Sequence, residues 1–280
     1  MKITNQLLTL AACTVLAATA SAADETYVLA KKDHTPKAGS KHVESKKMAM
    51  KNGTLKVKAG EQAMEGTCAI TETETEAVEY VSADKVKRLM TVGEKSQKMT
   101  MNGQELPDEP HPNPLLKVPV TLTKADGEWT ATLDDGKEPT DEQETALSKH
   151  EKNMDKSESV TMYGTEPRKV GDTWTVKAAD MPFAQDQEDT EGSVKLTFKA
   201  VEDYQGKKCA HLEGPMEIKG KSAEGQSISL KGNVIVYRSI EDLVDLKVSL
   251  DGKMEMSGDI PNGSMSMNGD MTMEFSTKVE

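Results

Sequence analysis

A two-residue alternation of side-chain character is the feature that most limits how this chain can fold, and it prevails from Thr54 onward. Leu55-Lys56-Val57-Lys58 alternates apolar with basic residues, and residues 71–76 alternate Thr with Glu. Successive side chains of a strand point to opposite faces, so this period is typical of β-sheets. The Thr/Glu run is expected to form a solvated sheet surface, and its spaced carboxylates are a poor cation site. The sequence therefore predicts a mainly β protein of antiparallel sheets.

Turn residues divide the chain into many short predicted strands. Gly93-Glu94-Lys95 indicates a hairpin between residues 86–92 and 98–101, and Asn102-Gly103 is a strong turn signal. The prolines between 107 and 114 exclude regular structure there. Further strands are expected at 117–123, 128–133, 193–201, 208–212, 216–219, 227–238, 243–250, 254–257 and 271–278.

One helix is predicted, beginning at Thr140. Thr140 is a suitable N-cap, Gln143 follows three residues later, and acidic residues occupy the first turn. The apolar stripe of this helix is narrow, so we expect it to lie across one sheet rather than inside a bundle. The stripe consists of Ala146, Leu147, His150 and Met154.

The segment from Tyr163 to Val176 lies between the two strand-rich halves. Pro167 fixes φ, Gly171 can adopt a positive φ, and Asp172 can bond to its own backbone, which predicts a turn. We therefore expect two lobes, an N-terminal one over 23–157 that ends in the helix and a C-terminal one over 158–280. Weak similarity between residues 133–136 and 250–253 suggests that the lobes arose by duplication.

The same segment carries a resemblance to a known group of proteins. Gly127-Glu128-Trp129-Thr130, an acidic helix and the Val170-Gly171-Asp172-Thr173-Trp174 turn follow one another in this order. The order resembles exported bacterial β-rich proteins of unknown function that share a Val-Gly-Asp-[Ser/Thr]-Trp turn. This resemblance implies an envelope protein with antiparallel sheets, and it implies no catalytic residues.

The first 22 residues have the build of a secretory signal peptide. Lys2 precedes an apolar run from Leu7 to Ala20, and Ala20-Ser21-Ala22 is a small-x-small cleavage site. We expect cleavage after Ala22 and a periplasmic or extracellular protein with no transmembrane segment. The alternative is a lipoprotein anchored at Cys13, because Leu10-Ala11-Ala12-Cys13 also fits a lipobox.

Cleavage after Ala22 would leave two cysteines, Cys68 and Cys209, and export would place them in an oxidising compartment. An even number of cysteines in an oxidising compartment favours a disulfide, here between Cys68 and Cys209. The alternative is two buried thiols in separate parts of the fold.

The charge of the chain limits its partners. A formal charge of -12 makes nucleic acid an improbable partner. Nine lysines between Lys31 and Lys58, against Asp33 and Glu44, nevertheless form a local basic segment. Such a segment could bind an anionic glycan or another envelope component, although the solvated face of edge strands is the favoured interpretation. The sequence does not predict the oligomeric state.

Three sets of residues were weighed as chemical sites. Met-x-Met occurs five times, and on a strand the two thioethers of a pair share a face. Such pairs can bind Cu(I), but they also fill cores that lack aromatic residues, which is the favoured interpretation. Residues 258–269 are rich in Gly, Ser and Asn, so the set most open to copper is the C-terminal one, namely Met265, Met267, Met271 and Met273.

The second set is a pair of acidic turns, one in each half. Asp134, Asp135 and Asp251 would have to converge to form the carboxylate pair of an aspartic-type hydrolase. Neither turn has a hydroxyl residue after the Asp, so both are better explained as hairpin turns. The third set, five scattered His residues, lacks the spacing of a zinc site.

These observations favour an exported, non-enzymatic binding or structural module without a cofactor. Usual nucleophile and phosphate-loop signatures are missing from the sequence. Two alternatives remain open at this stage. One is an acidic hydrolase acting on host or envelope glycoproteins such as mucin, and the other is copper binding through methionine.

Overall fold

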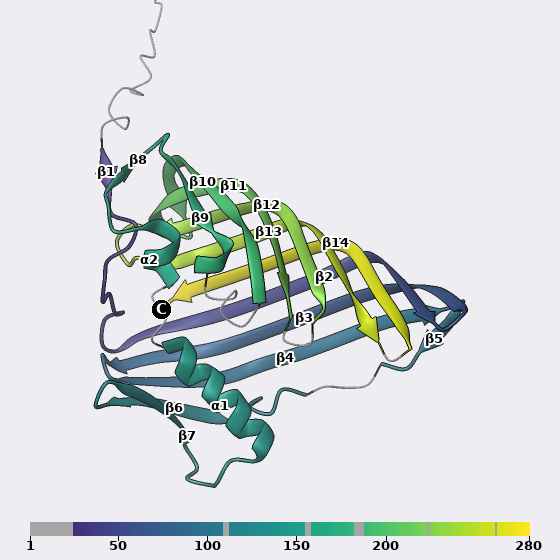
Figure 1. Ribbon diagram of the computed structural model, residues 1–280. Coiled ribbons are helices and arrows are strands. Elements are labelled where there is room, and N and C mark those ends of the chain that lie inside the picture. Colours follow the sequence, from purple (N-terminus) through teal and green to yellow (C-terminus); the bar gives the residue numbers. More distant parts are fainter. Residues whose placement is uncertain (1–24, 109–111, 155–157, 182–187, 223–224, 261) are drawn as a thin grey trace, which may run out of the picture.

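One large antiparallel sheet forms most of the molecule (Figure 1). The computed structural model describes residues 25–108, 112–154, 158–181, 188–222, 225–260 and 262–280. The strand order is β7-β6-β4-β3-β2-β14-β13-β12-β11-β10-β9, with β5 paired to β4, and β1 and β8 form a separate two-stranded sheet. The predicted mainly β class is confirmed, because 67% of the chain is strand and 10% is helix.

The elements have the following bounds. The strands are β1 (Thr26–Tyr27), β2 (Ser40–Ala59), β3 (Gln62–Ser82), β4 (Lys85–Met101), β5 (Gln104–Leu106), β6 (Pro119–Ala125), β7 (Glu128–Leu133), β8 (Arg168–Lys169), β9 (Thr173–Lys177), β10 (Glu188–Tyr204), β11 (Lys207–Lys221), β12 (Ser227–Ser239), β13 (Asp245–Ile260) and β14 (Gly263–Val279). The helices are α1 (Asp141–Met154), α2 (Glu158–Tyr163) and the 3-10 turn η1 (Ala178–Asp180).

The strands of the sheet centre are longer than the sequence predicts. The turns expected at Gly93 and around Asp251-Gly252 are absent, since both lie inside continuous strands, β4 and β13. These predictions were wrong because glycine in a strand also marks a close approach of two backbones. A Cβ on Gly252 would lie 2.3 Å from the carbonyl oxygen of Lys231, and one on Gly214 would lie 1.6 Å from that of Lys195.

The sheet curves, and its helices lie on the side toward which it curves (Figure 1). We call this side the inner face and the opposite side the outer face. α1 packs on the inner face over β6 and β7, where Leu147 joins a cluster with Leu122 and Leu133. Its N-terminus is capped as predicted, because the Gln143 N–H donates to Thr140 Oγ1 and the Thr140 N–H donates to Gln143 Oε1.

The larger core lies at the other end of the sheet. α2, β1 and η1 cover the inner face of β10 to β13 there, and Tyr163, Leu29, Phe198 and Leu212 are all fully buried in this cluster. The turn predicted between Tyr163 and Val176 is present. Gly171 has a φ of 95°, and Asp172 Oδ2 accepts a hydrogen bond from the Lys169 N–H at 2.8 Å. Trp174 donates its indole N–H to the Met162 carbonyl at 2.8 Å.

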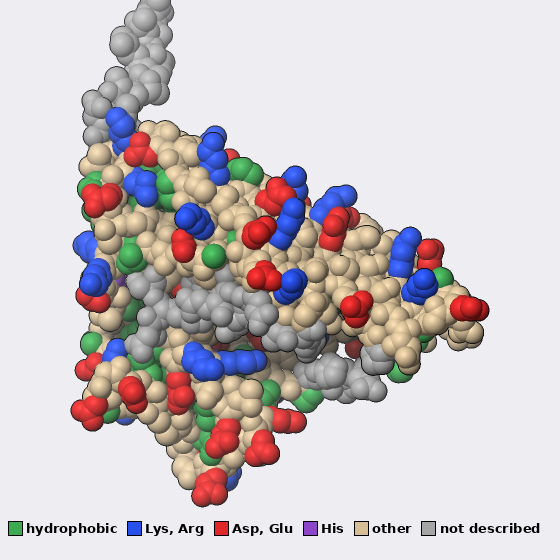
Figure 2. Space-filling model, viewed as in Figure 1, with side chains coloured by type: hydrophobic (Ala, Val, Ile, Leu, Met, Phe, Trp, Pro, Cys, Tyr) green, Lys and Arg blue, Asp and Glu red, His purple; other side chains and the backbone are tan. Residues whose placement is uncertain are grey.

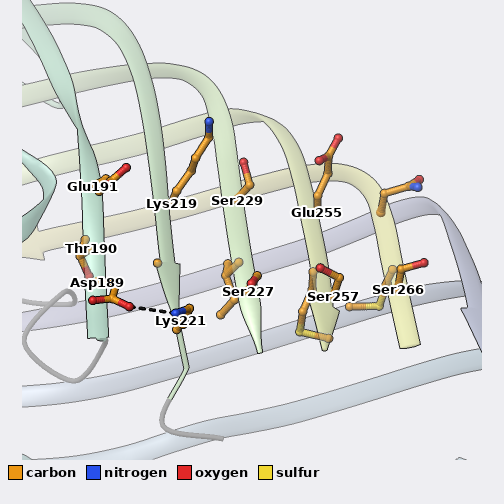
Figure 3. A pocket seen from close by; sticks show the side chains of 15 residues that line it. Asp189, Thr190, Glu191, Lys219, Lys221, Ser227, Ser229, Glu255, Ser257 and Ser266 are labelled. Carbon is orange, nitrogen blue, oxygen red and sulfur yellow. Dashed lines mark hydrogen bonds and ion pairs between the residues drawn. The ribbon is translucent and has the colours of Figure 1, made fainter. Parts of the chain in front are cut away.

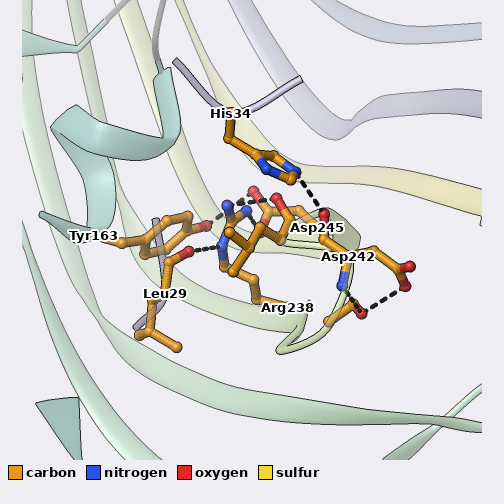
Figure 4. Close-up of polar contacts among 8 residues, drawn as sticks. Leu29, His34, Tyr163, Arg238, Asp242 and Asp245 are labelled. Carbon is orange, nitrogen blue, oxygen red and sulfur yellow. Dashed lines mark hydrogen bonds and ion pairs between the residues drawn. The ribbon is translucent and has the colours of Figure 1, made fainter. Parts of the chain in front are cut away.

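A buried arginine joins the covering elements to the sheet (Figure 4). Arg238 on β12 is 1% exposed, and its guanidinium donates to the carbonyls of Leu29 and Leu243 and to Asp245. The ring of Tyr163 lies under the guanidinium, and its hydroxyl donates to Asp245 at 2.9 Å. One cation thus ties together the N-terminal segment, α2 and two strands.

The two predicted lobes contribute to one uninterrupted sheet. β14 of the C-terminal half pairs with β2 of the N-terminal half over nearly its whole length. The predicted division at residues 157–158 therefore separates two covered ends of a shared sheet, and a duplication stays a prediction. The predicted signal peptide lies outside the described residues. Neither of the described helices has the length and apolarity that crossing a membrane requires.

Candidate binding face

Methionine lines the inner face where the two halves meet. Antiparallel register places Met273 of β14 opposite Leu250 and Met48, and Met267 opposite Met256 and Leu55. Residues directly opposite each other share a face of the sheet. By this register all five Met-x-Met pairs point to the inner face, as do the buried residues of the larger core.

A separate cluster lies on the part of this face that is nearest the β2–β3 and β13–β14 turns. Four buried residues, Met50, Leu55, Cys68 and Met267, form its centre. Its half-buried members are Val57, Ile70, Met99, Met101, Met254, Met256 and Met265. We call these residues the methionine cluster. It contains no residue of a described helix, which distinguishes it from the two covered cores.

An aromatic side chain is left exposed on the same face. Phe275 on β14 lies opposite Val248 of β13 and Lys46 of β2, so it points inward, and it is 41% exposed. A single exposed apolar side chain is ordinary on a protein surface, but Phe275 continues the inward row of Met271 and Met273 and so extends an apolar face. The sequence analysis missed Phe275, although its two-residue spacing from Met273 and Met271 was a usable signal.

Two adjoining hollows lie at the edge of the sheet where the β2–β3, β11–β12 and β13–β14 turns are found. One has a volume of about 880 Å³, and its lining includes inward Ile228, Met256 and Met267 as well as outward polar residues of the strand ends, among them Lys219, Ser229 and Glu255 (Figure 3). The other has a volume of about 550 Å³ and includes Val57, Met64 and Met265. Both hollows share Ser227, Ser257 and Ser266, so they form one continuous depression.

A charged band borders the apolar surface on β2, β3 and β4. Lys46 donates to Glu72 and, at 3.3 Å, to Glu74. Arg88 forms ion pairs with Glu76 at 2.6 Å and Glu44 at 2.9 Å. The expectation of a fully solvated Thr/Glu surface is therefore wrong for the Glu side, because these glutamates point to the inner face and are half-buried.

The pKa values of Arg88 and of His150, which faces the same band, are shifted. The Arg88 guanidinium has a raised pKa, since its carboxylate partners outweigh the cost of burial. His150 of α1 faces the same band, and burial lowers the pKa of its imidazole, with the Arg88 charge acting in the same direction. The inner face is thus amphipathic, with a large apolar part and a paired ionic part.

The outer face is polar along its length. Lysine and acidic side chains alternate over the part formed by β10 to β14 (Figure 2). The basic segment from Lys31 to Lys58 does not form one strip, because Lys46 points inward while Lys41 and Lys56 point outward and pair with Glu79 and Glu65. Binding of an anionic glycan by this segment stays a prediction.

The acidic residues proposed for hydrolysis do not converge. Asp134 follows β7 at one edge of the sheet and accepts from Thr121 Oγ1 at 2.5 Å, while Asp135 pairs with Lys137 at 2.8 Å. Asp251 points outward from the middle of β13, opposite Asn233 and Thr272. Five strands separate β7 from β13, and at about 4.8 Å per strand the carboxylates lie roughly 30 Å apart along the sheet.

The predicted disulfide is also absent, because Cys68 and Cys209 are both free and buried. Cys68 lies in the methionine cluster on β3, whereas Cys209 on β11 directs its thiol to the Tyr204 carbonyl. An oxidising compartment cannot pair these two cysteines, because they lie on different faces and at different ends of the sheet. Among the described residues no group of three or more His, Cys, Asp or Glu side chains is arranged to hold a metal ion.

Comparisons with known proteins do not assign this chain to a family. No family model matches the chain, and no curated protein matches it. A solved structure entitled "Lipid-protein interactions in lipovitellin" aligns with 88% of this chain at 8% identity and a TM-score of 0.41, which is too low to assign a shared fold. The chain spans about a quarter of the length of that protein, as 26% of it is covered.

Proposed function

We propose that the chain is an exported, non-enzymatic binding module that holds an elongated apolar ligand, such as an acyl chain, on its inner face. The observation that carries this proposal is the methionine cluster, which contains no residue of a described helix, together with the exposed Phe275 further along the same face of β14. Export rests on the leader-like first 22 residues of the sequence.

The size and chemistry of the depression support an aliphatic ligand. Sites for small molecules usually measure roughly 300–1,000 Å³, and the two hollows of about 880 and 550 Å³ lie in this range. Unbranched thioether side chains adapt to guests of varying shape, which suits a flexible chain better than a rigid ring system. Lys46 and the glutamates at the border would face the polar end of such an amphiphile.

The arrangement argues against a catalytic role for the predicted acids. An aspartic-type hydrolase requires two carboxylates that share a proton, and Asp251 lies far from Asp134 and Asp135, which pair with Thr121 and Lys137 instead of with each other. A purely structural module would have no reason to leave a row of apolar side chains half-buried on a concave face. Membership of the exported envelope family with the Val-Gly-Asp-Thr-Trp turn remains part of the proposal.

The test is binding of a fluorescent apolar probe, N-phenyl-1-naphthylamine, and its displacement by palmitate. Phe275→Ala should raise the dissociation constant roughly fivefold, because the ligand can cover only the 41% of Phe275 that is exposed and full burial is worth about 1.5–3 kcal/mol. Val81→Ala is the matched control, since Val81 is 39% exposed but lies at the β3–β4 turn.

A second pair of variants tests which face is used. Met256→Gln changes an inward side chain with little change in length, whereas Asp251→Asn changes an outward side chain of the same strand that lines neither hollow. We expect weaker probe binding for Met256→Gln alone. Probe binding that is absent from the wild type, or that is equally insensitive to both substitutions, would show that the inner face does not hold an apolar ligand.

A further inference from the structure

The floor of the methionine cluster contains a thiol among thioethers, and we propose that Cys68, Met99 and Met50 bind one Cu(I) ion, with Met101 as an additional ligand. This site differs from the C-terminal set of Met265, Met267, Met271 and Met273 predicted from the sequence. It also does not depend on the binding of an apolar ligand. Thiolate and thioether sulfur are the protein ligands that favour Cu(I).

Register places these residues at neighbouring inward positions of β2, β3 and β4. Met99 Sδ accepts a hydrogen bond from Gln97 Nε2 at 3.0 Å, which copper would have to displace. Cys68 on β3 lies directly opposite Met99 on β4, and Met101 is the next inward residue along β4. Met50 on β2 lies opposite Ile70, one inward position from Cys68. Directly opposed Cβ atoms are about 4.5–5.5 Å apart and diagonal neighbours about 7–8 Å, which long flexible side chains can span.

Two glycines and a bulge make room for this convergence. The β2 strand bulges between Met50 and Gly53, where Asn52 has a φ of 53°. A Cβ on Gly53 would lie 2.4 Å from Cys68 Sγ, so the thiol lies over the bare backbone of that glycine. Gly66 opposite Met101 likewise presents no side chain between the two strands.

The Cys68 thiol is unusual in having no hydrogen-bond partner among the described residues. It is 3% exposed, and an ordinary thiol is mostly protonated near neutral pH. Cys209, buried to the same degree, instead donates to the Tyr204 carbonyl at 4.0 Å and has no methionine opposite it. Of the two cysteines in the described part of the chain, Cys68 therefore combines a free buried thiol with neighbouring thioethers, and Cys209 does not.

Binding follows a simple balance. Cu(I) bonds to the Cys68 sulfur, the S–H bond breaks, and the proton leaves to solvent, while the copper stays in the same oxidation state. The thioethers of Met99 and Met50 complete the coordination without releasing protons. The site therefore releases one proton per ion near neutral pH, and its affinity rises with pH.

The experiment titrates the mature protein with Cu(I), supplied as its acetonitrile complex under argon, against the competitor bicinchoninate. We expect one ion per chain, one proton released, and an X-ray absorption spectrum with sulfur ligands only. Cys68→Ser and Met99→Leu should each raise the dissociation constant at least tenfold. Cys209→Ser and Met216→Leu are the matched controls, and they should leave it unchanged.

Two results would contradict the proposed copper site. The first is wild-type protein that cannot compete with bicinchoninate or that binds copper without releasing a proton, a measurement that needs no variant to fold. The second is equal loss of affinity in the Cys68 and Cys209 variants, which would place the ion elsewhere. Loss of N-phenyl-1-naphthylamine binding has no bearing on either result, so this proposal and the apolar-ligand proposal fail separately.

Discussion

Replacing Arg238 with Met should remove the link that holds the N-terminal segment and α2 to the sheet. The substitution keeps most of the aliphatic bulk but leaves Asp245 and the carbonyls of Leu29 and Leu243 without their donor. Removing one partner of a buried ion pair costs about 3–5 kcal/mol. The Asp245 side chain is 31% exposed, so water compensates part of the loss and we expect about 3 kcal/mol.

The expected change is large enough for thermal unfolding to measure. For a chain of this size 1 kcal/mol corresponds to about 2–4 °C, so the Tm of Arg238→Met should fall by roughly 6–12 °C. In a double-mutant cycle, adding Asp245→Leu should restore part of that loss, because the uncompensated carboxylate is removed. A Tm within about 3 °C of the wild type, or strictly additive effects of the two substitutions, would refute this account of Arg238.

Three further perturbations have defined outcomes. Burial lowers the pKa of the His42 and His150 imidazoles, so the unfolded chain binds protons at a higher pH than the folded chain does. The free energy of unfolding should therefore fall as the pH drops below about 6.5. His42→Phe should flatten the plot of urea midpoint against pH between pH 7 and 5, and an unchanged plot would contradict this. Gly214→Ala should lower the urea midpoint by an amount equivalent to about 1–3 kcal/mol, because the new Cβ meets the Lys195 carbonyl, whereas outward Ser229→Ala should not. In native protein that starts at Ala23, Cys68 and Cys209 should resist Ellman's reagent, and both should react in guanidinium; no free thiol after unfolding would indicate a disulfide instead.

The strands could be predicted from the sequence because their alternation is regular, but their lengths could not. Gly103 and Gly127 are true turn residues, with φ values of 79° and 90°. Gly252 was assigned to the same class, although Met254 and Met256 keep the same inward parity as Leu250 across it. A turn usually changes this phase, so unbroken parity on both sides of a glycine is a signal for a bend within one strand.

The orientation of the polar strands was harder to predict for a physical reason. Thr and Glu are both polar, so the alternation at 71–76 shows that two faces exist but not which one is inward. The choice is made by partners far away in the sequence, since Lys46 and Arg88 are 26 and 12 residues from Glu72 and Glu76. The methionine pairs posed the same problem, because their use as a packed core or as an open surface depends on what covers the sheet.

The two proposals share the methionine cluster of one inner face, and the shape of the sheet explains why sulfur-containing side chains form it. Close approach of the strands excludes side chains at Gly53, Gly252 and Gly269, and sulfur-containing side chains lie across two of these gaps, Cys68 over Gly53 and Met50 over Gly269. Rigid aromatic rings fit such a bent floor poorly, whereas thioethers adapt to it. Phe275 instead lies three inward positions further along β14 from Gly269, where the surface is open. The copper ligands form the floor of the same methionine cluster on which an apolar ligand would lie. A Cys68→Ser variant that still binds N-phenyl-1-naphthylamine normally would show that the thiol is needed for copper but not for the apolar ligand.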